Sequence, residues 1–75
     1  MKPGLHYAPL GMSREEAARY VGVGTTTFDR MVAEGVMPRP KRYRGRVLWN
    51  RVALELAFED LPENEGNMID KILGL

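Results

Sequence analysis

The order of apolar and polar residues predicts a helix over residues 25–34, around which the other elements are arranged. Phe28, Met31 and Val32 stand at i, i+3 and i+4, so a helix places all three on one face, towards a core. Polar side chains remain on the opposite face. We therefore expect this helix to offer one face to the protein and the other to a partner.

A second helix is predicted directly upstream, over residues 14–21. Ser13 and Glu16 form a capping box, in which each side chain accepts a hydrogen bond from a backbone N–H at the helix start. Gly22 follows the helix, and glycine readily takes the left-handed conformation that ends one. The residues expected to face the core are Ala17, Tyr20 and Val21. Together the two helices predict a helix-turn-helix.

The third predicted helix covers residues 51–61, with Asn50 as its N-cap and Pro62 beyond its end. Its apolar residues form a stripe at i, i+3, i+4 and i+7: Leu54, Ala57, Phe58 and Leu61. In a domain of this size the core is thin. We expect Leu54 and Phe58 to supply much of it together with Phe28 and Trp49, and replacement of Phe58 by alanine to cost about 3 to 5 kcal/mol.

A small β-hairpin is predicted between the second and third helices. Residues 41–43 and 47–49 contain strand-forming side chains, and Gly45 between them can take a positive φ. The predicted fold class is therefore mainly α with a small β-hairpin, a winged helix-turn-helix of three helices plus wing. The predicted organisation is an irregular lead-in at 1–11, one domain at 12–61, and an acidic tail at 62–75 with a weak helical turn at 68–73.

The net charge of +1 hides a sorting of charges along the chain. Residues 1–34 balance four bases against four acids, and residues 55–75 hold six acids and one base. Between them, residues 35–54 hold six bases and no acid: Arg39, Lys41, Arg42, Arg44, Arg46 and Arg51. This sorting favours a polyanion-binding surface with an acidic region beyond it over a merely solvated loop.

The composition argues against several functional classes. The chain has no cysteine and a single histidine, His6, so we expect no disulfide, metal site or cofactor. Ser13 is a helix cap without a base to activate it, and no acid–base pair or phosphate loop is present, so we do not expect an enzyme. No apolar run approaches the ~20 residues needed to span a bilayer, and no signal core follows Met1, which predicts a cytoplasmic protein without membrane contact.

Six pieces of the sequence, in order and with short spacers, resemble the excisionase-like and AlpA-like helix-turn-helix proteins, which are similar to the N-terminal winged helix of the MerR regulators. The pieces lie within residues 10–61: MSREEAA at 12–18, VGV at 21–23, TF at 27–28 with Arg30, EG at 34–35 before Pro38, GRV at 45–47 and WNR at 49–51. The resemblance implies that the second helix reads the major groove of double-stranded DNA and that the wing contacts the backbone or the neighbouring minor groove. Two positions depart from the family pattern, because Gly24 replaces a common serine cap and Asp29 replaces a common aromatic or basic residue.

The predicted DNA contacts fall into three groups. On the recognition helix they are Thr25, Thr26, Thr27, Asp29 and Arg30. On the wing and basic stretch they are Arg39, Lys41, Arg42, Arg44, Gly45 and Arg46. Further backbone contacts are expected from Arg14 and Arg51. We expect Trp49 to pack in the core, whereas Tyr43 can lie on either face of the hairpin and Thr27 can be a buried hydroxyl or a phosphate contact.

The leading hypothesis is a sequence-specific double-stranded DNA binder. It would act as an excisionase-like accessory factor of a phage or mobile element, or as a small transcriptional regulator, with an integrase, a recombinase or the transcription machinery as a further partner. The alternative is a protein-interaction module that docks an integrase, polymerase or replication protein. The target sequence and the oligomeric state on DNA stay open.

Overall fold

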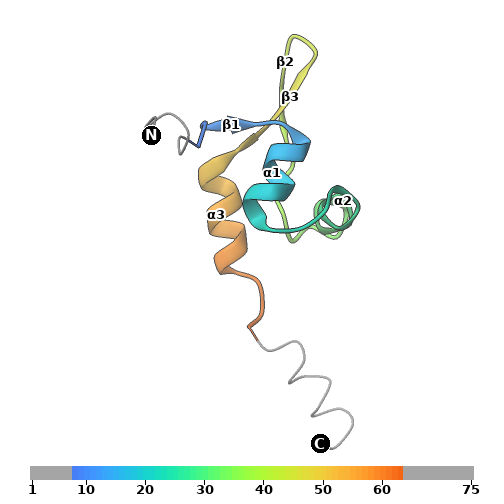
Figure 1. Ribbon diagram of the computed structural model, residues 1–75, viewed down its shortest axis with the longest axis vertical. Coiled ribbons are helices and arrows are strands. Elements are labelled where there is room, and N and C mark those ends of the chain that lie inside the picture. The colour runs from blue at the N-terminus through green and yellow to red at the C-terminus, as the bar shows by residue number, and fades with distance from the viewer. Residues whose placement is uncertain (1–7, 64–75) are drawn as a thin grey trace, which may run out of the picture.

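The computed structural model describes residues 8–63 of the chain. The elements follow in the order β1 (Gly11–Met12), α1 (Arg14–Val21), α2 (Thr25–Ala33), β2 (Lys41–Tyr43), β3 (Arg46–Asn50) and α3 (Arg51–Glu59). Figure 1 shows α1 between α2 and α3, with the β2–β3 hairpin projecting beyond the helices. The predicted three helices and hairpin are present, and an additional strand completes a three-stranded antiparallel sheet. This mixed α/β arrangement is consistent with a winged helix.

The additional strand, β1, was not predicted. It pairs antiparallel with β3, with Gly11 opposite Asn50 and Met12 opposite Trp49, so the strand order is β1-β3-β2. Two residues are too few to show the alternation of apolar and polar side chains that predicts a strand, so β1 can be recognised only from its pairing with β3. The irregular lead-in predicted for residues 1–11 is therefore wrong at Gly11. Residues 1–7 of that lead-in lie outside the described residues.

The ends of α1 form as the sequence predicts. Ser13 Oγ accepts a hydrogen bond from the Glu16 N–H at 3.2 Å, and Glu16 Oε1 accepts one from the Ser13 N–H at 2.8 Å. Gly22 ends the helix with a φ of 103°, and its N–H donates to the Ala18 carbonyl at 2.8 Å. The short connection to Thr25 then sets α2 directly after α1, as a helix-turn-helix requires.

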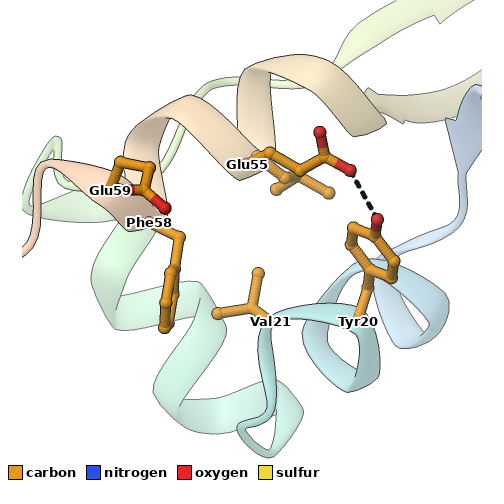
Figure 2. A pocket seen from close by; sticks show the side chains of 6 residues that line it. Tyr20, Val21, Glu55, Phe58 and Glu59 are labelled. Carbon is orange, nitrogen blue, oxygen red and sulfur yellow. Dashed lines mark hydrogen bonds between the residues drawn. The ribbon is translucent and has the colours of Figure 1, made fainter.

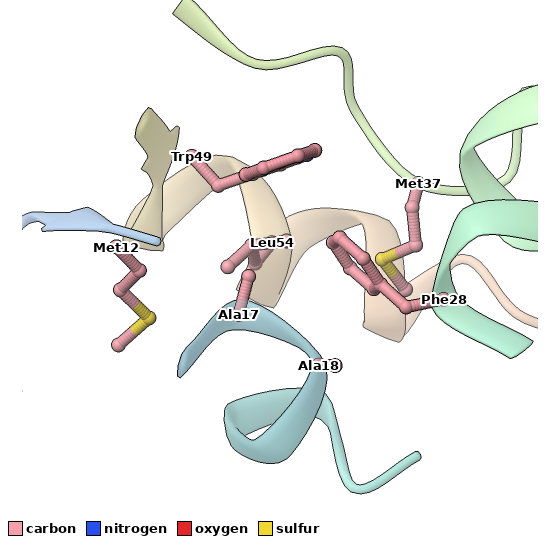
Figure 3. Packing of buried hydrophobic residues seen from close by; sticks show 7 residues of the cluster. All are labelled: Met12, Ala17, Ala18, Phe28, Met37, Trp49 and Leu54. Carbon is pink, nitrogen blue, oxygen red and sulfur yellow. The ribbon is translucent and has the colours of Figure 1, made fainter. Parts of the chain in front are cut away.

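A small cluster of buried residues connects all the elements except β2 (Figure 3). Its members are Met12, Ala17, Ala18, Phe28, Met37, Trp49 and Leu54. The rings of Phe28 and Trp49 meet edge to face, with centroids 5.2 Å apart and planes at 68°. The Trp49 Nε1–H donates to the Pro38 carbonyl at 2.8 Å. The predicted core placement of Phe28, Trp49 and Leu54 is confirmed.

Two residues predicted to face the core are instead half exposed. The exposed fraction is 52% for Phe58 and 43% for Tyr20. Leu54 takes the central position of α3 against the core, and Phe58 lies about 40° further round the helix, at the edge of the interface. On α1 the inward positions belong to Ala17 and Ala18, so Tyr20 is turned to the surface, where its hydroxyl donates to Glu55.

The helix ends differ slightly from the prediction. α3 ends at Glu59 with Asp60 as its C-cap, two residues before the predicted end, and α2 ends at Ala33 with Glu34 as its C-cap. At the other end of α3, the Asn50 side chain accepts from the Ala53 N–H at 2.9 Å, which confirms the predicted N-cap. The predicted helical turn at 68–73 lies outside the described residues.

The burial of Leu54 and the exposure of Phe58 predict unequal losses of stability. Leu54→Ala removes a fully buried side chain from the only cluster in the described residues and should lower the free energy of unfolding by about 2 to 5 kcal/mol. Phe58→Ala should lower it by only about 1 kcal/mol, because half of that side chain is already in water. Urea unfolding followed by circular dichroism measures both, and equal losses would contradict this packing.

Candidate nucleic-acid interface

The outward face of α2 consists of polar side chains opposite the buried Phe28. Thr26 and Arg30 are exposed and stand four residues apart, so they share the face that points away from the core. Thr27 is exposed as well, and Thr25 is half buried at the start of the helix. The alternative of a buried Thr27 hydroxyl is therefore excluded. Of the recognition-helix candidates, Thr26, Thr27 and Arg30 remain accessible to a partner.

Asp29 is not free to meet a partner, because its carboxylate binds Arg14. Arg14 Nε donates to Oδ1 at 2.8 Å and Nη2 donates to Oδ2 at 2.7 Å, a bidentate pair between the first turn of α1 and the middle of α2. The hydrogen bonds from Arg14 lower the pKa of Asp29, and the same bonds raise the pKa of Arg14. Two residues predicted to contact DNA thus bind each other and fix the angle between the two helices.

Arg51 is also held within the protein. Its Nη1 donates to the Ala8 carbonyl at 2.6 Å, and its Nε lies 3.8 Å from Glu55 Oε2. Glu55 in turn accepts from the Tyr20 hydroxyl at 2.5 Å, which raises the pKa of Tyr20. Arg51 therefore ties the segment before β1 to the start of α3.

The hairpin turns over two residues with left-handed backbone. Arg44 has a φ of 46° and Gly45 a φ of 84°, and two positive φ values are what a type I′ turn requires. Glycine takes this conformation without strain, whereas an arginine rarely does. The Arg44 guanidinium lies over the Tyr43 ring, 5.6 Å from its centroid. The predicted turn around Gly45 is confirmed, and the tip presents a cation and an aromatic ring together.

The pairing register separates the two faces of the hairpin. Tyr43 lies opposite Arg46 and Lys41 opposite Leu48, so these residues share the face away from the buried Trp49. Tyr43 is 64% exposed, which decides between the two orientations that the sequence left open. It was not among the predicted contact residues. The strands predicted at 41–43 and 47–49 would have paired Tyr43 with Val47, on the face of Trp49. The observed turn has only two residues, so Arg46 begins β3 and Tyr43 faces away from Trp49.

The cations of α2 and the wing differ from Arg14 and Arg51 in their pairing. Arg14 and Arg51 each form ion pairs, as described above. Among the described residues, seven exposed cations have no acidic partner within 4 Å. One is Arg19 on α1, and the other six lie on α2, the following loop and the hairpin: Arg30, Arg39, Lys41, Arg42, Arg44 and Arg46. The protein thus leaves uncompensated positive charge on the elements that the sequence assigned to DNA.

In residues 8–63, no cluster of three or more His, Cys, Asp or Glu side chains is placed to hold a metal ion. Over the same residues, every helix is too short and too polar to cross a bilayer.

Comparisons with protein-family models, with curated proteins and with solved structures give no significant match for this chain. The family resemblance therefore stays a hypothesis that rests on the sequence motifs.

The Arg14–Asp29 pair predicts a pH-dependent contribution to stability. Because the folded-state pKa of Asp29 is lowered from its ordinary value of 3.8, the pair stabilises the protein above that value and loses its effect as the pH falls through the folded-state pKa. Asp29→Asn should therefore be less stable than the wild type at about pH 7, and the difference should disappear at about pH 2. Thermal unfolding at both pH values measures it. A difference that does not change with pH would show that the ion pair is not its source.

Proposed function

We propose that the protein binds double-stranded DNA with α2 in the major groove and the β2–β3 hairpin on the flanking backbone. The observation that carries the proposal is the set of six exposed cations on α2, the following loop and the hairpin, none paired with an acid of residues 8–63. Phosphates on a duplex would supply the missing anionic partners, with release of condensed counterions. The three helices and sheet fit a winged helix-turn-helix, although the fold alone does not specify this use.

Within this proposal the residues have separate tasks. Thr26 and Arg30 face outward on α2 and would meet base edges, where arginine pairs best with guanine O6 and N7. Arg44, Arg46 and Lys41 on the hairpin would hold phosphates. Arg14 and Asp29 keep α2 at a fixed angle to α1 and are not assigned to DNA. Base recognition would therefore depend on a short list of side chains.

The start of α2 offers a further phosphate contact. Gly24 is the N-cap and provides no side-chain acceptor for the first N–H groups of the helix. These N–H groups and the positive end of the helix dipole suit an anion. The departure from the serine cap of the resembled family would thus leave backbone donors available to a phosphate.

The motifs shared with the excisionase-like and AlpA-like proteins suggest the biological setting. We propose an accessory factor for excision of a mobile element or a small transcriptional regulator.

The contribution of Arg30 to sequence recognition is testable once a preferred site has been selected from random duplexes. Arg30→Ala should weaken binding to that site by about 1 to 3 kcal/mol and weaken binding to random DNA much less. Arg19→Ala removes the same charge from an exposed position of α1 that is not assigned to base reading, and is the control for the loss of charge alone. Titrations by fluorescence anisotropy give both affinities. Equal losses on both DNAs would reduce Arg30 to a phosphate contact.

The wing should position the protein without reading bases. Replacing Arg44 and Arg46 together by alanine should lower the slope of log affinity against log salt by up to about 2. The ratio of specific to random affinity should hardly change, because phosphate contacts carry no sequence information. An unchanged slope in the double variant would remove the hairpin from the interface.

A further inference from the structure

A groove with an apolar floor runs between the end of α1 and the side of α3 that faces it (Figure 2). It is lined by Tyr20, Val21, Leu54, Glu55, Phe58 and Glu59. Phe58 and Tyr20 are about half exposed there, although both are large and apolar enough to pack inside a protein. Exposed apolar groups gathered in one hollow mark an interaction surface.

The size of the groove favours a protein side chain over a small molecule. Its volume is about 180 Å³. Pockets that bind small molecules typically enclose roughly 300–1,000 Å³. An anchor side chain of a helix laid between two helices fits this smaller space, as in other helix-in-groove complexes.

The rim of the groove is acidic. Glu55 and Glu59 line it, and Asp60 and Glu63 follow on the same segment. Arg51 is the only base of α3, and it already contacts Glu55. Glu59, Asp60 and Glu63 have no cationic partner within residues 8–63. A segment that covers the floor must therefore bring positive charge to the rim, or the Glu59 carboxylate loses water without compensation beside the further acids Asp60 and Glu63.

This charge argues against two occupants from the chain itself. A second copy docked symmetrically through α3 would set one acidic rim against another. The sequence beyond Glu63 is apolar enough to fill the floor, but it carries Glu65 and Asp70 against a single Lys71. Neither occupant supplies the positive charge that the rim lacks.

The groove uses none of the residues assigned to DNA. It lies between α1 and α3, and no residue of α2, of the following loop or of the hairpin lines it (Figure 2). A partner in the groove would therefore leave the proposed DNA surface uncovered. From the apolar floor, the acidic rim and this location, we propose that the groove between α1 and α3 binds a basic amphipathic helix of a partner protein.

The experiment selects peptides against the full-length chain. A displayed library of random peptides of about 14 residues, roughly four helical turns, is panned on the wild type. The expected sequences combine Lys or Arg with apolar residues spaced three or four apart. They should perturb the NMR signals of Phe58, Tyr20 and their neighbours, and not those of the hairpin. Phe58→Lys should weaken their binding about tenfold or more.

Val52→Lys is the matched control. Val52 is a half-exposed apolar residue of the same helix but does not line the groove, so the variant adds the same charge elsewhere on α3. It should keep peptide affinity within about threefold of the wild type. Circular dichroism must show both variants folded, and both should bind DNA as the wild type does. Because the DNA readout is separate, failure of this proposal and failure of the proposed function are distinguishable.

Several results would overturn the proposal. In the peptide selection, these results are the enrichment of acidic or uncharged peptides and the absence of any enrichment. In the later measurements, they are an equal loss of peptide affinity in Phe58→Lys and Val52→Lys, and changes of NMR signals that map to the hairpin. A shift of the Phe58 signals when the chain is cut after Glu63 would assign the groove to the chain's own tail instead. Self-association that Phe58→Lys abolishes would assign it to a second copy.

Discussion

The position of Trp49 is the constraint on which the rest of the structure depends. Its ring meets Phe28 of α2 edge to face, its Nε1–H holds the Pro38 carbonyl, and its backbone pairs β3 with Met12 of β1. One side chain therefore connects the helix-turn-helix, the loop after it and the sheet. The hairpin has no core of its own, because β2 is exposed along its whole length. Its direction relative to α2 is set where β3 enters the core, at Trp49.

The rest of the core contains few large side chains, and other apolar side chains remain exposed at the surface. α1 contributes two alanines, which bring its backbone close to α3, while α2 and α3 each contribute one fully buried large residue, Phe28 and Leu54. A domain of this size has too little interior to bury every apolar side chain. The excess stays exposed on two sides of α3. Val52 and Leu56 point away from the core and Phe58 lies at the edge of the core-facing side, with exposed fractions of 43% to 63%. The surface available to a protein partner thus follows from the same small core that fixes the proposed DNA-binding elements.

The features that the sequence predicted correctly are those decided over a few neighbouring residues. The capping box at Ser13, the left-handed Gly22, the Asn50 cap and the turn at Gly45 depend on local hydrogen bonds and backbone preference. The errors lie where distant segments decide. The periodicity of α3 predicts a broad apolar stripe, but the neighbouring elements determine which edge of that stripe is buried. For this reason the prediction that Phe58 lies in the core was wrong. The Arg14–Asp29 pair joins residues 15 apart in sequence, and β1 exists only through β3.

Ion pairs within the fold decide which of the charged residues remain unpaired at the surface, and where they lie. Arg14 and Arg51 look like DNA contacts in the sequence, yet each is neutralised by a carboxylate of the neighbouring helix or turn. Removing these two cations leaves the unpaired bases of residues 8–63 on α2, the following loop and the hairpin, apart from Arg19 on α1. The unpaired acids at the end of α3 lie on the other side of α1 (Figure 1). A protein with a net charge near zero can therefore present two surfaces of opposite sign, and a duplex and a basic helix would not compete for the same one.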